Sequence, residues 1–141
     1  MPICFFYRLM CVLVILIVPL PVVAHHSFRS QYDSDQPITL SGVVTKIDWM
    51  NPHVYFYLDV KDETTGNVER WSLEMGPPHM LQRRGWKRTT MQIGDVMEVH
   101  ATRARDGSNT ANARKVTVAE TGEVLGAASS EGQTVTGQTI E

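Results

Sequence analysis

The stretch that decides the fold is ITLSGVVTKIDWMNPHVYFYLDV, residues 38–60. Its second half, 53–60, alternates between apolar and polar side chains, which predicts a half-buried β-strand. Its first half, 38–49, carries two sets of apolar residues of opposite parity. The parity changes at Gly42-Val43, which predicts a bulge built on a permissive glycine. Asn51-Pro52 is typical of a turn, so the stretch predicts two neighbouring strands.

Three more strands and one short helix are predicted downstream. A third strand is expected from about 68 to 75. A short helix is expected over 79–84, because a proline pair precedes this segment and a glycine follows it. Two further strands are expected over 96–103 and 111–118. This order predicts an all-β fold with one short helix, a five-stranded OB-like Greek-key barrel of order β-β-β-α-β-β. Another small five-stranded barrel or an open sandwich is the alternative.

Segments of a different character flank the predicted barrel. Residues 1–24 combine one arginine, an apolar run and small or β-branched residues before a cleavage position after Ala24, which predicts a secretory signal peptide. The apolar run is too short and too interrupted by proline for a membrane span of about 20 residues. The chain therefore divides into the signal peptide, an N-terminal arm at 25–37, the OB-like barrel at 38–119 and a tail at 120–141. The tail has few large apolar residues and is expected to be disordered.

Composition narrows the function classes. Both cysteines, Cys4 and Cys11, lie in the signal peptide, so the 117 residues that remain of 141 after removal of 24 have no disulfide, thiolate metal site or thiol nucleophile. The formal net charge is −2, and loss of Arg8 changes it to −3, which argues against nucleic acid as a partner. The mature protein is expected in the periplasm or secreted, with no membrane span after cleavage.

The chain also resembles a known family. The segments that carry the likeness are HHSF at 25–28, residues 39–60, WSLEMG at 71–76, RRGW at 83–86 and IGDVMEVHATRARDGSNTANA at 93–113. In combination they resemble a family of exported bacterial proteins of unknown function, number 6152 in the domain-of-unknown-function series. The resemblance implies an exported small β-barrel and brings no established reaction. This chain departs from the family pattern in its long tail and in His79.

Polar residues of two loops are expected to converge on one edge of the barrel. In an OB-fold the loop between strands one and two and the loop between strands four and five flank the ligand face. The ligand-binding candidates at this edge are Asn51, His53, Tyr55, Arg103, Arg105, Asp106, Ser108 and Asn109. The alternative interpretation is that the two loops contain ordinary turn residues and that His53 bonds to a backbone group.

A pair of histidines at the predicted mature N-terminus indicates a metal site. Cleavage after Ala24 makes His25 the first residue and His26 the second. The α-amine, with a pKa of roughly 8, and the imidazoles, with a pKa of roughly 6.5, are partly neutral near neutral pH. Nitrogen ligands of this kind suit Cu(II), and His53 or His100 would add a third nitrogen. The alternative is a pair of polar histidines on a mobile arm.

Recognisable catalytic motifs are absent from the sequence. It contains no GxSxG elbow, no HExxH helix, no P-loop and no dinucleotide fingerprint. The leading hypothesis is a non-enzymatic exported module that binds an unknown small ligand or a periplasmic protein at the loop-lined edge. The competing hypothesis is a periplasmic copper-binding protein that uses the N-terminal histidines, and copper is the one cofactor considered.

Overall fold

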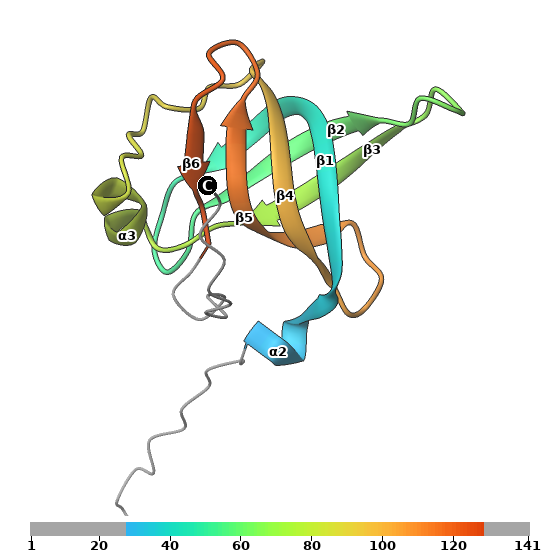
Figure 1. The fold of residues 1–141 in the computed structure, drawn as a ribbon, viewed down its shortest axis with the longest axis horizontal. Helices are drawn as coiled ribbons and strands as arrows, with labels where there is room; N and C mark the ends of the chain where they lie inside the picture. The colour runs from blue at the N-terminus through green and yellow to red at the C-terminus, as the bar shows by residue number, and fades with distance from the viewer. Residues whose placement is uncertain (1–27, 129–141) are drawn as a thin grey trace, which may run out of the picture.

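Five strands close into a ring. The computed structural model describes residues 28–128, and Figure 1 shows them as a barrel with α3 at its left and α2 below it. The elements in chain order are α2 (Phe28–Gln31), β1 (Tyr32–Asp48), β2 (Tyr55–Lys61), β3 (Val68–Glu74), α3 (Pro78–Arg83), β4 (Val96–Ala104), β5 (Thr110–Val118) and β6 (Val124–Gly126). The ring runs β1-β2-β3-β5-β4 and back to β1, and the β3–β5 pair that closes it is parallel. The prediction of an all-β, five-stranded barrel is confirmed.

The 17-residue strand β1 belongs to both sides of the ring. Its first part pairs with β4 and its second part pairs with β2, and Val43 takes part in both pairings. The strand therefore curls strongly around Gly42. A Cβ at Gly42 would lie 2.6 Å from the carbonyl oxygen of Asp59 on β2. Glycine is needed here because the two backbones approach too closely for any side chain.

The predicted position of the bulge in this strand is wrong. The register shifts between Val44 and Lys46, which makes Thr45 the extra residue. Val44 is fully buried, whereas Val43 is 41% exposed. The apolar parity does change along β1, but it changes at Thr45. The glycine upstream permits the close approach of β2 and does not mark the bulge.

The core fills the inside of the ring and one of its ends. Every ring strand contributes buried apolar side chains to a single cluster. Leu81 of α3 and Trp86, which follows that helix, are also buried in the cluster. The helix therefore packs against the barrel core, and Figure 1 shows α3 at the left, on the side of β6.

The C-terminal segment is ordered further than predicted. The composition favours disorder from residue 120, but β6 pairs with β5 and Ala127 is fully buried. Trp86 donates its indole N–H to the carbonyl oxygen of Gly126 at 2.9 Å, and the amide of Gly76 donates to Ala127. The small residues of this segment are ordered because neighbouring elements bind its backbone by hydrogen bonds and bury its alanine side chains. The prediction of disorder is wrong for residues 120–128.

Several predictions concern residues outside the described part of the chain. The signal peptide at 1–24, His25, His26 and residues 129–141 all lie there. Within residues 28–128, no helix is long and apolar enough to cross a membrane.

Candidate ligand-binding site

A row of buried polar side chains crosses the outer wall of the barrel. Glu74, Asn112 and Thr102 are the buried polar residues of the described chain, with exposed fractions of 5%, 1% and 7%. Glu74 pairs with Asn112 across the β3–β5 seam, and Asn112 pairs with Thr102 across β5 and β4. Their sequence neighbours, such as Leu73 and Ala111, belong to the core. Because side chains alternate along a strand, the three residues of this row face outward.

Glu74 is the most heavily bonded member of the row. The Tyr32 hydroxyl donates a hydrogen bond to Glu74 Oε2, and His53 Nδ1 contacts Glu74 Oε1. Tyr55, the partner of Glu74 on β2, also hydrogen-bonds to this carboxylate. Burial, with the neighbouring Glu74 charge and hydrogen bond, raises the pKa of Tyr55 to about 12. Burial and the hydrogen bond to Glu74 also raise the pKa of Tyr32. Three donors thus stabilise a carboxylate that is nearly out of contact with water.

The segment α2 and the first residue of β1 cover this row. Tyr32 is only 2% exposed, and its ring packs against Phe28 with ring centroids 5.2 Å apart. Arg105, just after the end of β4, binds this N-terminal segment through two residues. Its Nε donates to the Arg29 carbonyl oxygen at 2.8 Å, and its guanidinium lies 3.2 Å from Asp33 Oδ1. Tyr32 therefore covers Glu74, the member of the polar row that its hydroxyl bonds.

Asn112 differs from Glu74 in having no hydrogen-bonding partner among the described residues. Neither its amide oxygen nor its amide nitrogen makes a hydrogen bond there. A buried polar group left unpaired costs about 1–3 kcal/mol. Folded proteins keep few such groups, and a polar molecule held beside the amide would satisfy it.

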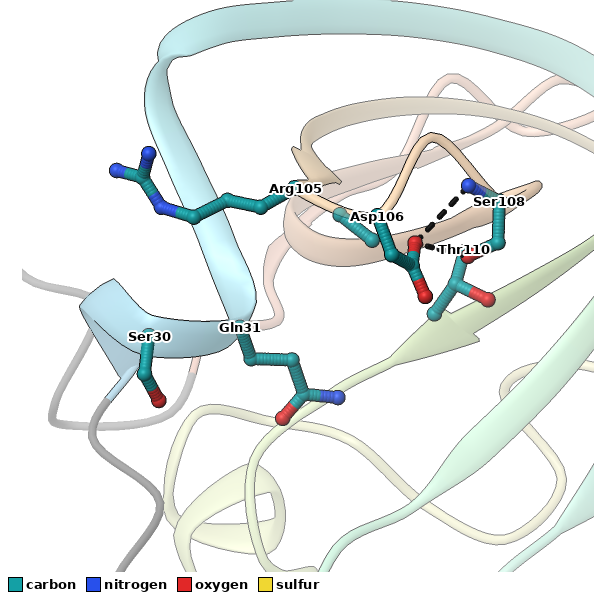
Figure 2. Close-up of a pocket in the computed structure, with 7 residues that line it drawn as sticks. Ser30, Gln31, Arg105, Asp106, Ser108 and Thr110 are labelled. Atoms are coloured by element: carbon teal, nitrogen blue, oxygen red, sulfur yellow. Dashed lines mark hydrogen bonds between the residues drawn. The ribbon is translucent and has the colours of Figure 1, made fainter.

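An open hollow of about 760 Å³ lies beside the row, between α2 and the loop that joins β4 to β5. Figure 2 shows Asp106, Ser108 and Thr110 gathered on its β5 side and Gln31 reaching toward it from α2. Asp106 Oδ1 accepts hydrogen bonds from the backbone and the hydroxyl of Ser108, which lower the pKa of this carboxyl. Thr110 stands two residues before Asn112 on the same face of β5. That spacing is about 7 Å along the strand.

The predicted site residues separate into groups in the structure. His53 and Tyr55 meet at Glu74, while Arg105, Asp106 and Ser108 line the hollow. The remaining candidates do not join them. Arg103 lies over the Trp71 ring and donates to the Gly107 carbonyl oxygen, and Asn109 contacts Glu69. Asn51 is exposed at the turn before Pro52, to which it is joined by a cis peptide bond.

Four residues of the site are not apparent from the sequence. Glu74, Asn112 and Thr102 occupy the polar positions of alternating strands, where side chains are ordinarily solvated. Tyr32 lies in the segment whose composition indicates a polar arm. No local pattern distinguishes these residues, because the arm that buries them is placed only by the fold.

The described residues hold no metal centre by themselves. Within residues 28–128, no group of three or more His, Cys, Asp or Glu side chains could hold a metal ion. His53 uses Nδ1 for Glu74, so its other ring nitrogen, Nε2, is the atom that could meet a ligand. A histidine oriented by a carboxylate in this way is typical of metal-ligating imidazoles.

A comparison with protein-family models assigns the chain to a family. The model described as a family of unknown function, DUF6152, matches residues 13–113. The chain belongs to this family. The match covers the barrel from α2 to the first part of β5, including Glu74 and Asn112. A comparison with curated proteins and a comparison with solved structures found no match.

Proposed function

We propose that this DUF6152 protein is an exported, non-enzymatic β-barrel module that binds a small polar ligand on the outer wall of its barrel. The ligand enters the hollow between α2 and the β4–β5 loop and extends along β5 toward the polar row. Export is supported by the signal-peptide pattern of residues 1–24. Binding is supported by the hollow itself, because ligand sites are typically concave and have a few polar groups that point into them.

The unpaired amide of Asn112 is the observation that carries this proposal. The Asn112 side chain is 1% exposed and makes no hydrogen bond among the described residues. Its burial lowers the stability of the folded protein, and an apolar residue at this position would avoid that loss. Asn112 does not itself line the hollow, so a ligand group must extend past Thr110 and displace what covers the amide, and there it would supply both a donor and an acceptor. Natural proteins commonly retain residues at binding sites that lower stability in exchange for function.

The polar groups around the hollow favour a ligand rich in hydroxyl groups. Asp106 presents carboxylate oxygens, which accept hydrogen bonds and donate none. Ser108, Thr110 and Gln31 add groups that donate as well as accept. Hydroxyl groups satisfy both kinds of partner, and they bring no negative charge toward the carboxylate. A monosaccharide or another small polyol fits this chemistry.

The test is an NMR titration of the mature protein with glucose and glycerol as probes. We expect backbone and side-chain amide shifts at Gln31, Ser108, Thr110 and Asn112. Asn112→Leu preserves the side-chain volume and removes the amide, so it should abolish the shifts while the protein stays folded. Asn67→Leu, in the exposed β2–β3 hairpin, is the matched control and should leave them unchanged.

Two outcomes would overturn the proposal. One is an absence of saturable shifts around the hollow with either probe. The other is equal binding by the wild type and Asn112→Leu, since the amide would then have no part in recognition.

Copper binding is the second candidate function, and His53 is the described residue that favours it. Its contact through Nδ1 with Glu74 orients Nε2 as a ligand atom. The other two proposed ligands, His25 and His26, lie outside the described residues, so their part rests on the sequence pattern. Cu(II) prefers such nitrogen ligands.

A Cu(II) titration of protein with a verified mature N-terminus tests this candidate. We expect tight binding that weakens about tenfold or more in His53→Ala and when one residue is added before His25. His79→Ala, a histidine at α3, is the matched control. Binding no tighter than that of the His53→Ala variant would refute a site that includes His53.

A further inference from the structure

A second hollow on the outer wall has a different chemical character. It lies over β1, β4 and β5, has a volume of about 430 Å³, and is lined by Arg114 together with Ser34, Thr39, His100 and Thr102. We propose that this second hollow is a binding site for a small oxyanion, with Arg114 as its principal ligand. No part of this proposal depends on a polyol in the first hollow.

Arg114 is a cation without a counter-charge among the described residues. Within residues 28–128 its guanidinium makes no hydrogen bond and no ion pair, and it lies over the Phe28 ring, 5.6 Å from the ring centroid. The side chain is partly buried, and this burial lowers the pKa of the guanidinium. Two other arginines of the barrel wall are paired, since Arg70 reaches Asp59 and Arg105 reaches Asp33.

An unpaired, partly buried arginine is suited to binding oxyanions. Its planar guanidinium presents five N–H donors in a fixed fork that matches the oxygen atoms of a phosphate, sulfate or carboxylate. Partial burial strengthens the attraction because fewer water molecules screen the charge. The Phe28 ring holds the guanidinium by a cation–π contact and leaves its N–H edge for a ligand.

Neutral donors surround this charge. Thr39 Oγ1 lies 3.1 Å from His100 Nδ1, and both side chains line the hollow. Ser34 and Thr102 add hydroxyl groups from the arm and from β4. Hydroxyl groups can donate hydrogen bonds to the remaining oxygen atoms of an oxyanion. The hollow thus combines one cation with several donors.

The acidic groups near the hollow do not cancel its charge. Glu98, on β4, lies 3.4 Å from His100 Nε2, while Arg114 stands one strand away on β5. Asp33, which precedes Ser34, is engaged by Arg105. Asp35 accepts no side-chain cation among the described residues and is exposed to water. The positive centre of the hollow is therefore Arg114.

An NMR titration with three anions tests the proposal. Inorganic phosphate, sulfate and acetate are added separately to the mature protein, with chloride adjusted to hold the ionic strength constant. We expect saturable shifts at Thr39, His100 and Thr102 for at least one anion, and the tightest anion identifies the class. Arg114→Gln should weaken its binding at least about tenfold. Arg88→Gln, an exposed arginine with the same change of charge, should leave it unchanged.

A further variant keeps the test decisive if Arg114→Gln unfolds. Arg114→Lys retains the charge and loses the fork, so it should bind with intermediate affinity. The wild-type titration stands by itself, and no saturable shift with any of the three anions would overturn the proposal. Equal weakening by Arg88→Gln would overturn it as well, because binding would then follow net charge.

Discussion

At the scale of single residues, two neighbours in the polar row differ in their hydrogen bonding. Among the described residues Glu74 has three hydrogen-bonding partners and Asn112 has none, although the two are paired across the same seam. The Glu74 carboxylate binds Tyr32 and so helps to hold the arm in place. The Asn112 amide makes no hydrogen bond that would stabilise the fold. This contrast separates a structural role for Glu74 from the binding role that we propose for Asn112.

Asn112→Leu should raise the stability of the protein. The substitution keeps the volume of the side chain and removes two unpaired polar atoms from a buried position. The expected gain in the free energy of unfolding is about 1 kcal/mol, measured by urea denaturation. A loss of stability of similar size would instead show that the amide is paired in solution.

Tyr55 should make the stability fall at alkaline pH. Its pKa rises from 10.0 to about 12 on folding, chiefly through burial and then through the charge of Glu74. The folded state holds the phenolic proton more tightly, so this contribution is complete below pH 10 and is lost between pH 10 and about 12. Unfolding measured across that range should show a shallower decline in Tyr55→Phe than in the wild type.

At the scale of elements, β1 shows how one strand serves two pairings. Its curl around Gly42 brings it against β2, and its bulge at Thr45 restores the apolar side chains to the interior. Both devices increase the local twist, which a closed ring of five strands demands. The glycine and the bulge are three residues apart and have separate tasks.

Gly42→Ala should destabilise the barrel by about 2 kcal/mol, because the added methyl group would meet the Asp59 carbonyl oxygen. Thermal and urea unfolding provide the measurement. Ser41→Ala, at the exposed neighbouring position, should change little. Equal effects of the two substitutions would contradict the role assigned to the close approach.

Trp86→Phe should loosen β6. The variant loses the indole N–H that donates to the Gly126 carbonyl oxygen, at a cost of about 1 kcal/mol beyond the change in packing. Amide exchange at Leu125 should become faster. Trp49→Phe is a matched control, because the Trp49 indole N–H has no partner among the described residues. Similar losses of stability in both variants would assign the effect to packing alone.

At the scale of the whole molecule, the arm connects the two proposed sites. The segment from Phe28 to Tyr32 covers the polar row, contributes Gln31 to one hollow and stands against Arg114 at the other through the Phe28 ring. A short segment that precedes the barrel in sequence thus forms part of both sites.

Export should leave a chain that begins at His25. Intact mass spectrometry of the protein from the periplasmic or secreted fraction should give the mass of residues 25–141. Replacement of Ala24 by a bulky residue should block cleavage, because the peptidase reads a small residue at that position. Recovery of the full-length mass outside the cytoplasm would contradict the predicted cleavage.

The sequence by itself was enough to predict the five strands of the ring and the class of fold, but not β6. Alternation over 53–60, turn residues at fixed places and a proline–glycine frame around α3 all act within a few residues, so they can be recognised locally. His53 and Tyr55 are also predicted as site residues from their place beside a turn, and the structure brings both to Glu74.

Only the tertiary structure decided where the site lies. Glu74, Asn112 and Thr102 look like ordinary outward-facing residues, and they become a buried row because β3 meets β5 and the arm lies over them. Likewise β6 exists because Trp86 and Gly76 supply hydrogen bonds to this segment from distant parts of the chain. Burial of a polar residue depends on contacts between segments far apart in sequence, and such contacts leave no mark on the local pattern.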